Sequence, residues 1–423
     1  MSKAGSIVAQ RPPATYRAAL LFGFPLLVLA LGHMLSNLLR TLPAVATDVI
    51  SVDIGVTAAS LASLTGAYHI AFAAGQIPVG VALDRYGVRT VSLTLFAIVT
   101  AGAVLAATVG GASGFLAAQV VLGIGCCGML LCPMTLAAKL LTPQQFGLWS
   151  GLIQGVGNTG MLLSASPLAW LIEHHGWRAG FWAAAIFAVV IAALVTFFVS
   201  NESPGPAMTR RAIRSEAREV VRIGLSPQLR GIVVLAFSSF AAAIAVRGLW
   251  GGPWLMDMRH LGRIEAGNAL LPLTIALVVG PMIYGIVDRR SGSRRKLLVV
   301  GHLVAALVLF VVASARPGGW MSQWLGGAVL PVGVDVSAFL LFGAAIAVQP
   351  LLFAMGRAVV SPEHAGKALA AINLSFFAGA AVVQSLTSPI AAAWGLPAVM
   401  VFLGAVLLVA TWTFAFLTRK SGG

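Results

Sequence analysis

Runs of about twenty apolar residues recur along the whole chain of 423 residues. A bilayer core of about 30 Å is crossed by roughly 20 residues of α-helix. Runs of this length predict membrane-spanning helices, because no water is available there to pair with the backbone N–H and C=O groups. The alternation of apolar and polar residues that a membrane barrel strand needs is absent. The sequence therefore predicts an all-α integral membrane protein.

Twelve spans are expected from the positions of these runs. They cover residues 18–46, 58–82, 90–110, 114–139, 148–172, 179–200, 231–256, 266–287, 297–315, 332–358, 368–393 and 396–417. The first run is too long for the apolar part of a cleavable signal peptide, and no clear small-residue cleavage site follows it. It is therefore expected to remain as the first helix.

The basic residues predict the orientation of these spans. Twenty-seven Lys and Arg against twelve Asp and Glu give a net charge of +15, which in a soluble protein would suggest nucleic-acid binding. Charged residues make up only 9% of the chain and hydrophobic residues 59%, so a soluble fold and a nucleic-acid partner are not expected. With the N-terminus inside, 21 basic residues fall in cytoplasmic segments and 4 outside. This predicts a multi-pass protein of the cell (inner) membrane, with both termini cytoplasmic and the lipid bilayer as its surroundings.

A polar, basic segment at residues 201–230 separates six spans from six others. It predicts a first bundle at residues 1–200, a cytoplasmic basic linker at 201–230 with a short helix near 210–223, and a second bundle at 231–423. The halves repeat in sequence: Thr142-Pro143 and Ser361-Pro362 begin similar loops at equivalent places. Parallel repeats of six helices place a substrate site between the halves, near the middle of the membrane.

A short motif follows the second span of each half. The first copy has the pattern G-x-x-x-D-R-x-G-x-R, formed by Gly80, Asp84, Arg85, Gly87 and Arg89. The second copy contains Asp288 and Arg289, and its glycine stands three rather than four residues before the aspartate. Together with the twelve spans, the basic linker and Gly176-Trp177-Arg178, the motif resembles the signature of the major facilitator superfamily. The resemblance implies two pseudo-symmetric six-helix bundles that rock about a central cavity, in the alternating-access manner of a secondary active transporter. It also implies that the motif is a cytoplasmic latch of the outward-facing state.

Asp84 needs a stabilising partner because it ends a helix, where the helix dipole disfavours an anion. Arg85, Arg89 or the N-terminal end of another helix could provide one. Gly80 and Gly87 would permit close approach and a tight turn. The alternative is a basic turn that serves membrane topology alone.

Two arginines lie inside predicted spans, at comparable depths in the first helix of each half. They are Arg40 and Arg247, and no Asp or Glu lies at matching depth in these two spans. Charges inside a membrane are functional candidates by default, and the guanidinium fork suits carboxylate or phosphate. The pair is also similar to the arginine pair of the family's organophosphate antiporters. These residues therefore predict an anion site, unless both side chains reach outward to the lipid headgroups.

Polar residues of the first span support a cavity. His33, Asn37 and Arg40 are spaced i, i+4, i+7 and share one helical face. His33 could carry a coupling proton, or it could be a neutral histidine bonded to a neighbouring helix. Asp335 is the one acid expected to approach as another proton carrier. Gln154 and Asn373, 219 residues apart, are expected either to face each other across the cavity or to pair between helices.

The most plausible function on this basis is transport of a small organic or inorganic anion, by proton symport or anion exchange, in a monomer without cofactors. A copper importer is an alternative, since Cys126, Cys127 and Cys132 offer soft ligands, although adaptable packing explains them too. A sensor with the transporter fold is another. Gly157-Asn-Thr-Gly160 departs from the Gly-Pro-x-x-Gly-Gly run of the family's drug exporters, which disfavours that branch. No motif of an enzyme is present.

Overall fold

The computed structural model describes residues 16–56, 58–164, 166–201, 213–326, 330–361 and 364–419, and every regular element in these ranges is a helix. The predicted all-α fold class is confirmed. Within these ranges, nine helical stretches are long and apolar enough to cross a membrane.

The described part of the first half contains eight helices. They are α1 (Tyr16–Val45), α2 (Thr47–Asp53), α3 (Ala58–Thr108), α4 (Ala112–Cys126), α5 (Leu131–Leu140), α6 (Pro143–Leu163), α7 (Ser166–His175) and α8 (Trp177–Phe198). A short helix, α9 (Ile213–Gly224), follows at the place where the sequence predicts one in the linker. Residues 202–212 of that linker lie outside the described residues.

The second half repeats this arrangement with more breaks. Its elements are α10 (Arg230–Ile244), the π-helix η1 (Ala245–Trp250), α11 (Gly251–Arg259), α12 (Arg263–Ala269), α13 (Leu271–Ser291), α14 (Arg294–Ser314), α15 (Trp320–Trp324), α16 (Val332–Ile346), α17 (Pro350–Ala358) and α18 (Ala365–Leu417). The predicted span 231–256 is thus a composite of α10, η1 and α11.

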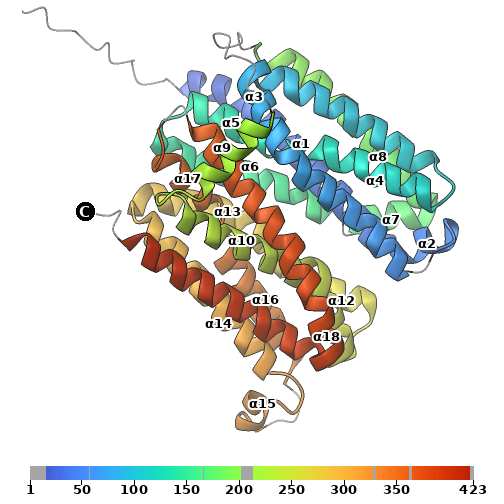
Figure 1. Ribbon diagram of the computed structural model, residues 1–423. Helices are drawn as coiled ribbons and strands as arrows, with labels where there is room; N and C mark the ends of the chain where they lie inside the picture. The colour runs from blue at the N-terminus through green and yellow to red at the C-terminus, as the bar shows by residue number, and fades with distance from the viewer. Residues whose placement is uncertain are drawn as a thin grey trace, which may run out of the picture.

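Two of the helices, α3 and α18, each contain two predicted spans. Gly87 in α3 has φ +76° and Gly395 in α18 has φ +77°, and both interrupt the helical backbone. Such angles are readily adopted only by glycine. The expected tight turn at Gly87 is confirmed, and Figure 1 shows the two limbs of α18 meeting at one end of the molecule.

Two other predicted spans are broken near their middle. The span 114–139 is divided between α4 and α5, and the span 332–358 between α16 and α17. Pro133 lies in the first turn of α5, and Pro350 begins α17. Proline has no N–H to donate to the preceding turn, so a helix tends to end before it and restart at it.

The helices form two groups, coloured blue to green and yellow to red in Figure 1. Two seams between them are α6 against α13 and α3 against α18, beside which α17 packs on α6 and α5 packs on α18. At the first seam, a methyl group on Gly151 would lie 2.2 Å from the carbonyl oxygen of Pro281. Glycine therefore allows these two backbones to touch, as in other membrane helix pairs.

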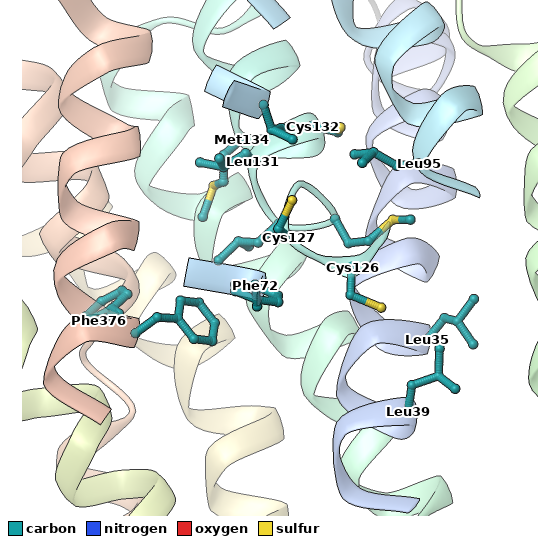
Figure 2. Packing of buried hydrophobic residues seen from close by; sticks show 14 of the residues in the cluster. Leu35, Leu39, Phe72, Leu95, Cys126, Cys127, Leu131, Cys132, Met134 and Phe376 are labelled. Carbon is teal, nitrogen blue, oxygen red and sulfur yellow. The ribbon is translucent and has the colours of Figure 1, made fainter. Parts of the chain in front are cut away.

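The three cysteines lie in the core of the first half. All are buried, and Figure 2 shows their sulfurs pointing to different sides among Leu35, Leu95 and Phe72. Within the described part of the chain, no three His, Cys, Asp or Glu side chains are grouped so as to hold a metal ion. The copper hypothesis therefore finds no such donor set there, and the thiols fill apolar space.

Candidate functional site

Arg40 and Arg247 line the same two adjoining cavities between the halves. The central cavity measures about 50 Å³, and the vestibule next to it about 400 Å³. Both arginines belong to both linings. They therefore stand at the boundary between the two spaces, one from each half of the chain.

Arg40 projects from α1 toward the second half. Its guanidinium donates to Asn37 Oδ1, one turn earlier on the same helix. Its Cζ lies 5.5 Å from the ring centre of Phe240 and 6.0 Å from that of Phe377. Both rings belong to the second half, so Arg40 makes cation–π contacts across the interface.

Arg247 lies in the π-helix η1. Its Nη2 donates to the carbonyl oxygen of Met161 in α6 at 3.1 Å, and its Nε is buried without a hydrogen-bond partner. Short π-helical turns are frequent at functional sites. An unpaired buried donor on a cation is a free position for an anionic acceptor.

Neutral polar groups complete the central cavity. They are His33, Asn37, Gln154, Asn158, Gln349 and Asn373. Among the described residues, no aspartate or glutamate lines either cavity. The fixed charge of the site is therefore that of its two arginines.

His33 and Asn37 attach α1 to α6. His33 Nε2 donates to Gln154 Oε1 at 3.2 Å, and Asn37 Nδ2 donates to the carbonyl oxygen of Gly157 at 2.9 Å. The predicted partners Gln154 and Asn373 line the same cavity but bond to other residues. Gln154 holds His33, whereas Asn373 donates to Gln76 Oε1 of α3.

A second contact joins the halves one turn from Asn373. The ring centres of Phe72 and Phe377 lie 4.0 Å apart, and both side chains are buried. Sequence reasoning missed Phe72, Gln76, Phe240 and Phe377. Gln76 could have been noticed as an amide inside a span, but the phenylalanines have no signal that separates them from other apolar residues.

Asp335 lies outside both cavity linings. Its Oδ2 is 2.6 Å from Arg259 Nε, and its Oδ1 accepts from Trp254 Nε1 at 2.7 Å. The side chains of both charged residues are 1% exposed. The structure therefore places this acid in a buried ion pair within the second half and does not bring it to His33.

The motif residues gather at one end of the molecule, which we call the basic face (residues 84–89, 138–147, 288–295, 357–361 and 364–367). Asp84 lies against Gly366 at the start of α18. Arg89 Nη2 donates to the carbonyl oxygen of Thr196 at 2.8 Å, and Arg85 lies over the ring of Tyr86. Gly80 approaches Ala370 of α18, which matches the expected close approach.

In the second copy, Asp288 pairs with a different cation from the adjacent one. Arg294 Nη2 lies 2.7 Å from Asp288 Oδ2, whereas Arg289 is exposed at the end of α13. The carboxylate lies against Gly147 of α6. A third contact is made by Arg357, which donates to the carbonyl oxygens of Ala138 and Leu141 at the end of α5.

These features define a class of protein: a helical membrane protein whose two groups of helices enclose a polar cavity with two arginines. The family follows from comparison with known proteins. The model of the Major Facilitator Superfamily matches residues 29–381, so the chain belongs to this family. It is accordingly a multi-pass membrane transporter of small molecules rather than an enzyme.

Two curated relatives are named for resistance to particular compounds. The tetracenomycin C resistance and export protein of Streptomyces glaucescens is 26% identical over 389 residues, covering 74% of this chain and 68% of the relative. The methylenomycin A resistance protein of Bacillus subtilis (strain 168) is 22% identical over 357 residues, covering 75% of this chain and 72% of the relative.

Solved structures share the fold at low sequence identity. The human organic anion transporter MFSD10 (TETRAN) superposes with a TM-score of 0.70 at 16% identity, covering 93% of this chain and 98% of that one. The fucose:proton symporter FucP of E. coli superposes with a TM-score of 0.72 at 14% identity, covering 94% and 98%.

Proposed function

We propose that the protein carries a small organic anion whose charged group binds between Arg40 and Arg247. The observation that carries this proposal is that both arginines line the same cavities while no described acid does. Two cations without a counter-ion in a membrane interior are costly. An anion between them removes that cost and can accept from the unpaired Nε of Arg247.

The apolar part of the lining suggests an organic body for the anion. Phe240, Phe376, Phe377, Met161 and Leu277 line the central cavity beside the arginines. Aromatic rings and methionine bind apolar ligand surface, while a few polar groups orient it. A carboxylate attached to an aromatic or aliphatic body matches this mixture better than a fully hydrated inorganic ion.

Proton symport is the form of coupling that the site's charges favour. His33 lines the cavity with Arg40 and Arg247, and the described lining contains no acid. A proton on His33 adds a third positive charge, which the two arginines oppose. Bound anion cancels part of that repulsion, so proton and anion assist each other's binding by the same factor.

In this proposal the basic face is cytoplasmic, as the distribution of Lys and Arg predicts. The vestibule, on the other side of the arginine pair, then opens outward. The contacts of Asp84, Asp288 and Arg357 hold the cytoplasmic side closed in this outward-facing state.

Export of a drug-like compound is a second candidate, supported by the resistance for which both curated relatives are named and by the export for which one of them is named. It is compatible with an anion site if the exported compound carries an acidic group. The two candidates differ in direction and in substrate charge, so both can be tested with one preparation.

The test uses the full-length protein in proteoliposomes with radiolabelled benzoate as the anion and benzamide as its neutral counterpart. Benzoate uptake should exceed that in empty liposomes, and benzamide uptake should not. Arg40→Ala and Arg247→Ala should each lower benzoate uptake on the order of 10- to 100-fold, because each removes a charge-assisted hydrogen bond.

Arg316→Ala is the matched control, since Arg316 is exposed and lines neither cavity. Undiminished uptake in both cavity variants would overturn the anion proposal. Saturable uptake of neutral drugs alone would favour the drug-export candidate, and absence of any flux would favour a sensor.

His33→Gln tests the proton coupling, since glutamine retains a donor toward Gln154. We expect benzoate exchange to persist in this variant and uphill uptake driven by a pH gradient to disappear. Equal responses to the gradient in His33→Gln and the wild type would remove His33 from the coupling.

A further inference from the structure

The α3–α18 seam is built as a regular series of four contacts. The residues of α3 are Phe72, Gln76, Gly80 and Asp84, each four positions from the last and therefore on one helical face. Their partners in α18, taken toward its N-terminus, are Phe377, Asn373, Ala370 and Gly366. We call these eight residues the seam.

One end of the seam reaches the binding site, and the other reaches the basic face. Phe377 lies 6.0 Å from the guanidinium of Arg40 and 4.0 Å, ring to ring, from Phe72. Asp84 forms the far end against Gly366. A continuous row of contacts thus runs from an anion-binding candidate to the contact that closes the basic face.

Phe377 is the member of the seam that contacts both Arg40 of the binding site and Phe72 of α3. It is 7% exposed and also packs on Phe240, with ring centres 5.0 Å apart. Phe240 contacts Arg40 as well, but the ring contacts found for it are with Phe376 and Phe377, both in the second half. The ring of Phe377 therefore connects Arg40 of the first half to the α3–α18 seam between the two halves.

The other seam differs in construction. Along α6 and α13, a methyl group on Gly151 would lie 2.2 Å from the carbonyl oxygen of Pro281, and one on Gly155 would lie 2.8 Å from that of Val278. These two contacts join helix backbones directly. The phenylalanine rings beside Arg40 instead contact the α3–α18 seam, where Phe377 packs on Phe72.

We propose that Phe377 couples occupancy of the arginine pair to opening of the α3–α18 seam. In the empty protein, the charge of Arg40 attracts the rings of Phe377 and Phe240 and so holds the second half against the first. An anion that pairs with Arg40 offsets this charge and weakens the attraction. The seam then opens more easily when an anion is bound, so the loaded carrier changes conformation more readily than the empty one. This inference rests on the proposed anion site.

The ring of Phe377 determines which substitutions should change the opening of the seam. Phe377→Leu keeps an apolar side chain in the seam but removes the ring that Arg40 and Phe72 contact. Phe377→Tyr keeps the ring. Phe414 is the matched control, because it lies in the same helix and is 0% exposed, but it lines neither cavity and lies outside the seam.

The experiment measures opening directly, as the distance between spin labels at Leu140→Cys and Arg290→Cys. These exposed positions lie at the basic face, one in each half. Full-length protein is reconstituted in nanodiscs and examined without ligand and with benzoate. Protein without the two introduced cysteines gives the background from the native thiols.

Without ligand, Phe377→Leu should raise the ratio of open to closed protein on the order of tenfold over the wild type, the scale of a desolvated cation–π contact. Phe377→Tyr and Phe414→Leu should match the wild type. Phe72→Leu, which removes the ring partner in α3 and leaves Arg40 untouched, should open the protein in the same direction. Phe72→Leu replaces Phe377→Leu in the test if Phe377→Leu does not fold.

Equal open fractions in Phe377→Leu and the wild type, or equal shifts in Phe377→Leu and Phe414→Leu, would overturn the coupling role. These comparisons need no ligand. A failure of benzoate to bind would count against the proposed function, and the ligand-free comparison would still decide the role of Phe377.

Discussion

The carboxylate of Asp84, from the first half of the chain, lies against Gly366 in the first turn of α18, from the second half. A methyl group on Gly366 would lie 3.1 Å from Asp84 Oδ1. Asp288 has the same relationship to Gly147 near the start of α6, where a methyl group would lie 2.6 Å from Oδ2. Each acid therefore faces the positive N-terminal end of a helix from the opposite half.

Replacing either acid by its amide should favour opening at the basic face. Asp84→Asn removes the favourable interaction with the helix end, worth about 0.3–1 kcal/mol and up to ~2 when partly buried. Asp288→Asn should have the larger effect, because it also leaves Arg294 without its carboxylate. The distance between labels at the basic face measures both. Asp53→Asn is the control, since Asp53 pairs with Arg178 inside the first half; an equal effect there would contradict the prediction.

Arg357→Gln should open the basic face in the same direction. Arg357 of α17 donates to the carbonyl oxygens of Ala138 and Leu141, which end α5 in the other half. Cations interact favourably with a helix C-terminus, and the carbonyl acceptors do not titrate. The effect of Arg357→Gln on label distance should therefore be the same at pH 5 and pH 8. A marked dependence on pH would show that an acid takes part in this contact.

Gly157 and Gly160 should respond differently to alanine. At Gly160 the added methyl would lie 2.0 Å from the backbone oxygen of Met34, so α1 and α6 must separate. Such overpacking costs about 1–3 kcal/mol, and the melting temperature in detergent should fall. At Gly157 the methyl would meet the ring of His33, which can rotate away. Gly157→Ala should keep its stability and lose uphill uptake driven by pH, because His33 loses Gln154.

Most of the fold could be predicted from hydrophobic runs and basic loops alone. The repeat between halves also predicted that Arg40 and Arg247 would lie at equivalent places, since both follow from position in the chain. The ion-pair partner of Asp288 could not be predicted from the sequence. Arg289 is adjacent in sequence, but the turn at Gly292 brings Arg294 to the carboxylate. The contacts of Phe377 could not be predicted either, because the sequence does not show which residues of the other half a phenylalanine in a span packs against.

Variants of the buried ion pair between Asp335 and Arg259 test whether an acid outside the cavity takes part in transport. Removing one partner leaves a buried charge uncompensated, which costs about 3–5 kcal/mol. Arg259→Leu and Asp335→Asn should therefore lower thermal stability, and Arg259→Leu more, because the ionised carboxylate then keeps only Trp254 as a donor among the described contacts.

The double variant Arg259→Met with Asp335→Leu separates the two roles of Asp335. Replacing a buried pair by apolar side chains of similar volume is often neutral for stability. If the pair is structural, the double variant recovers much of the lost stability and keeps pH-driven uptake, because His33 and the arginines lie elsewhere. A stable double variant that exchanges benzoate but no longer responds to a pH gradient would instead make Asp335 the proton carrier. Uptake and melting temperature measured on the same preparations decide between these outcomes.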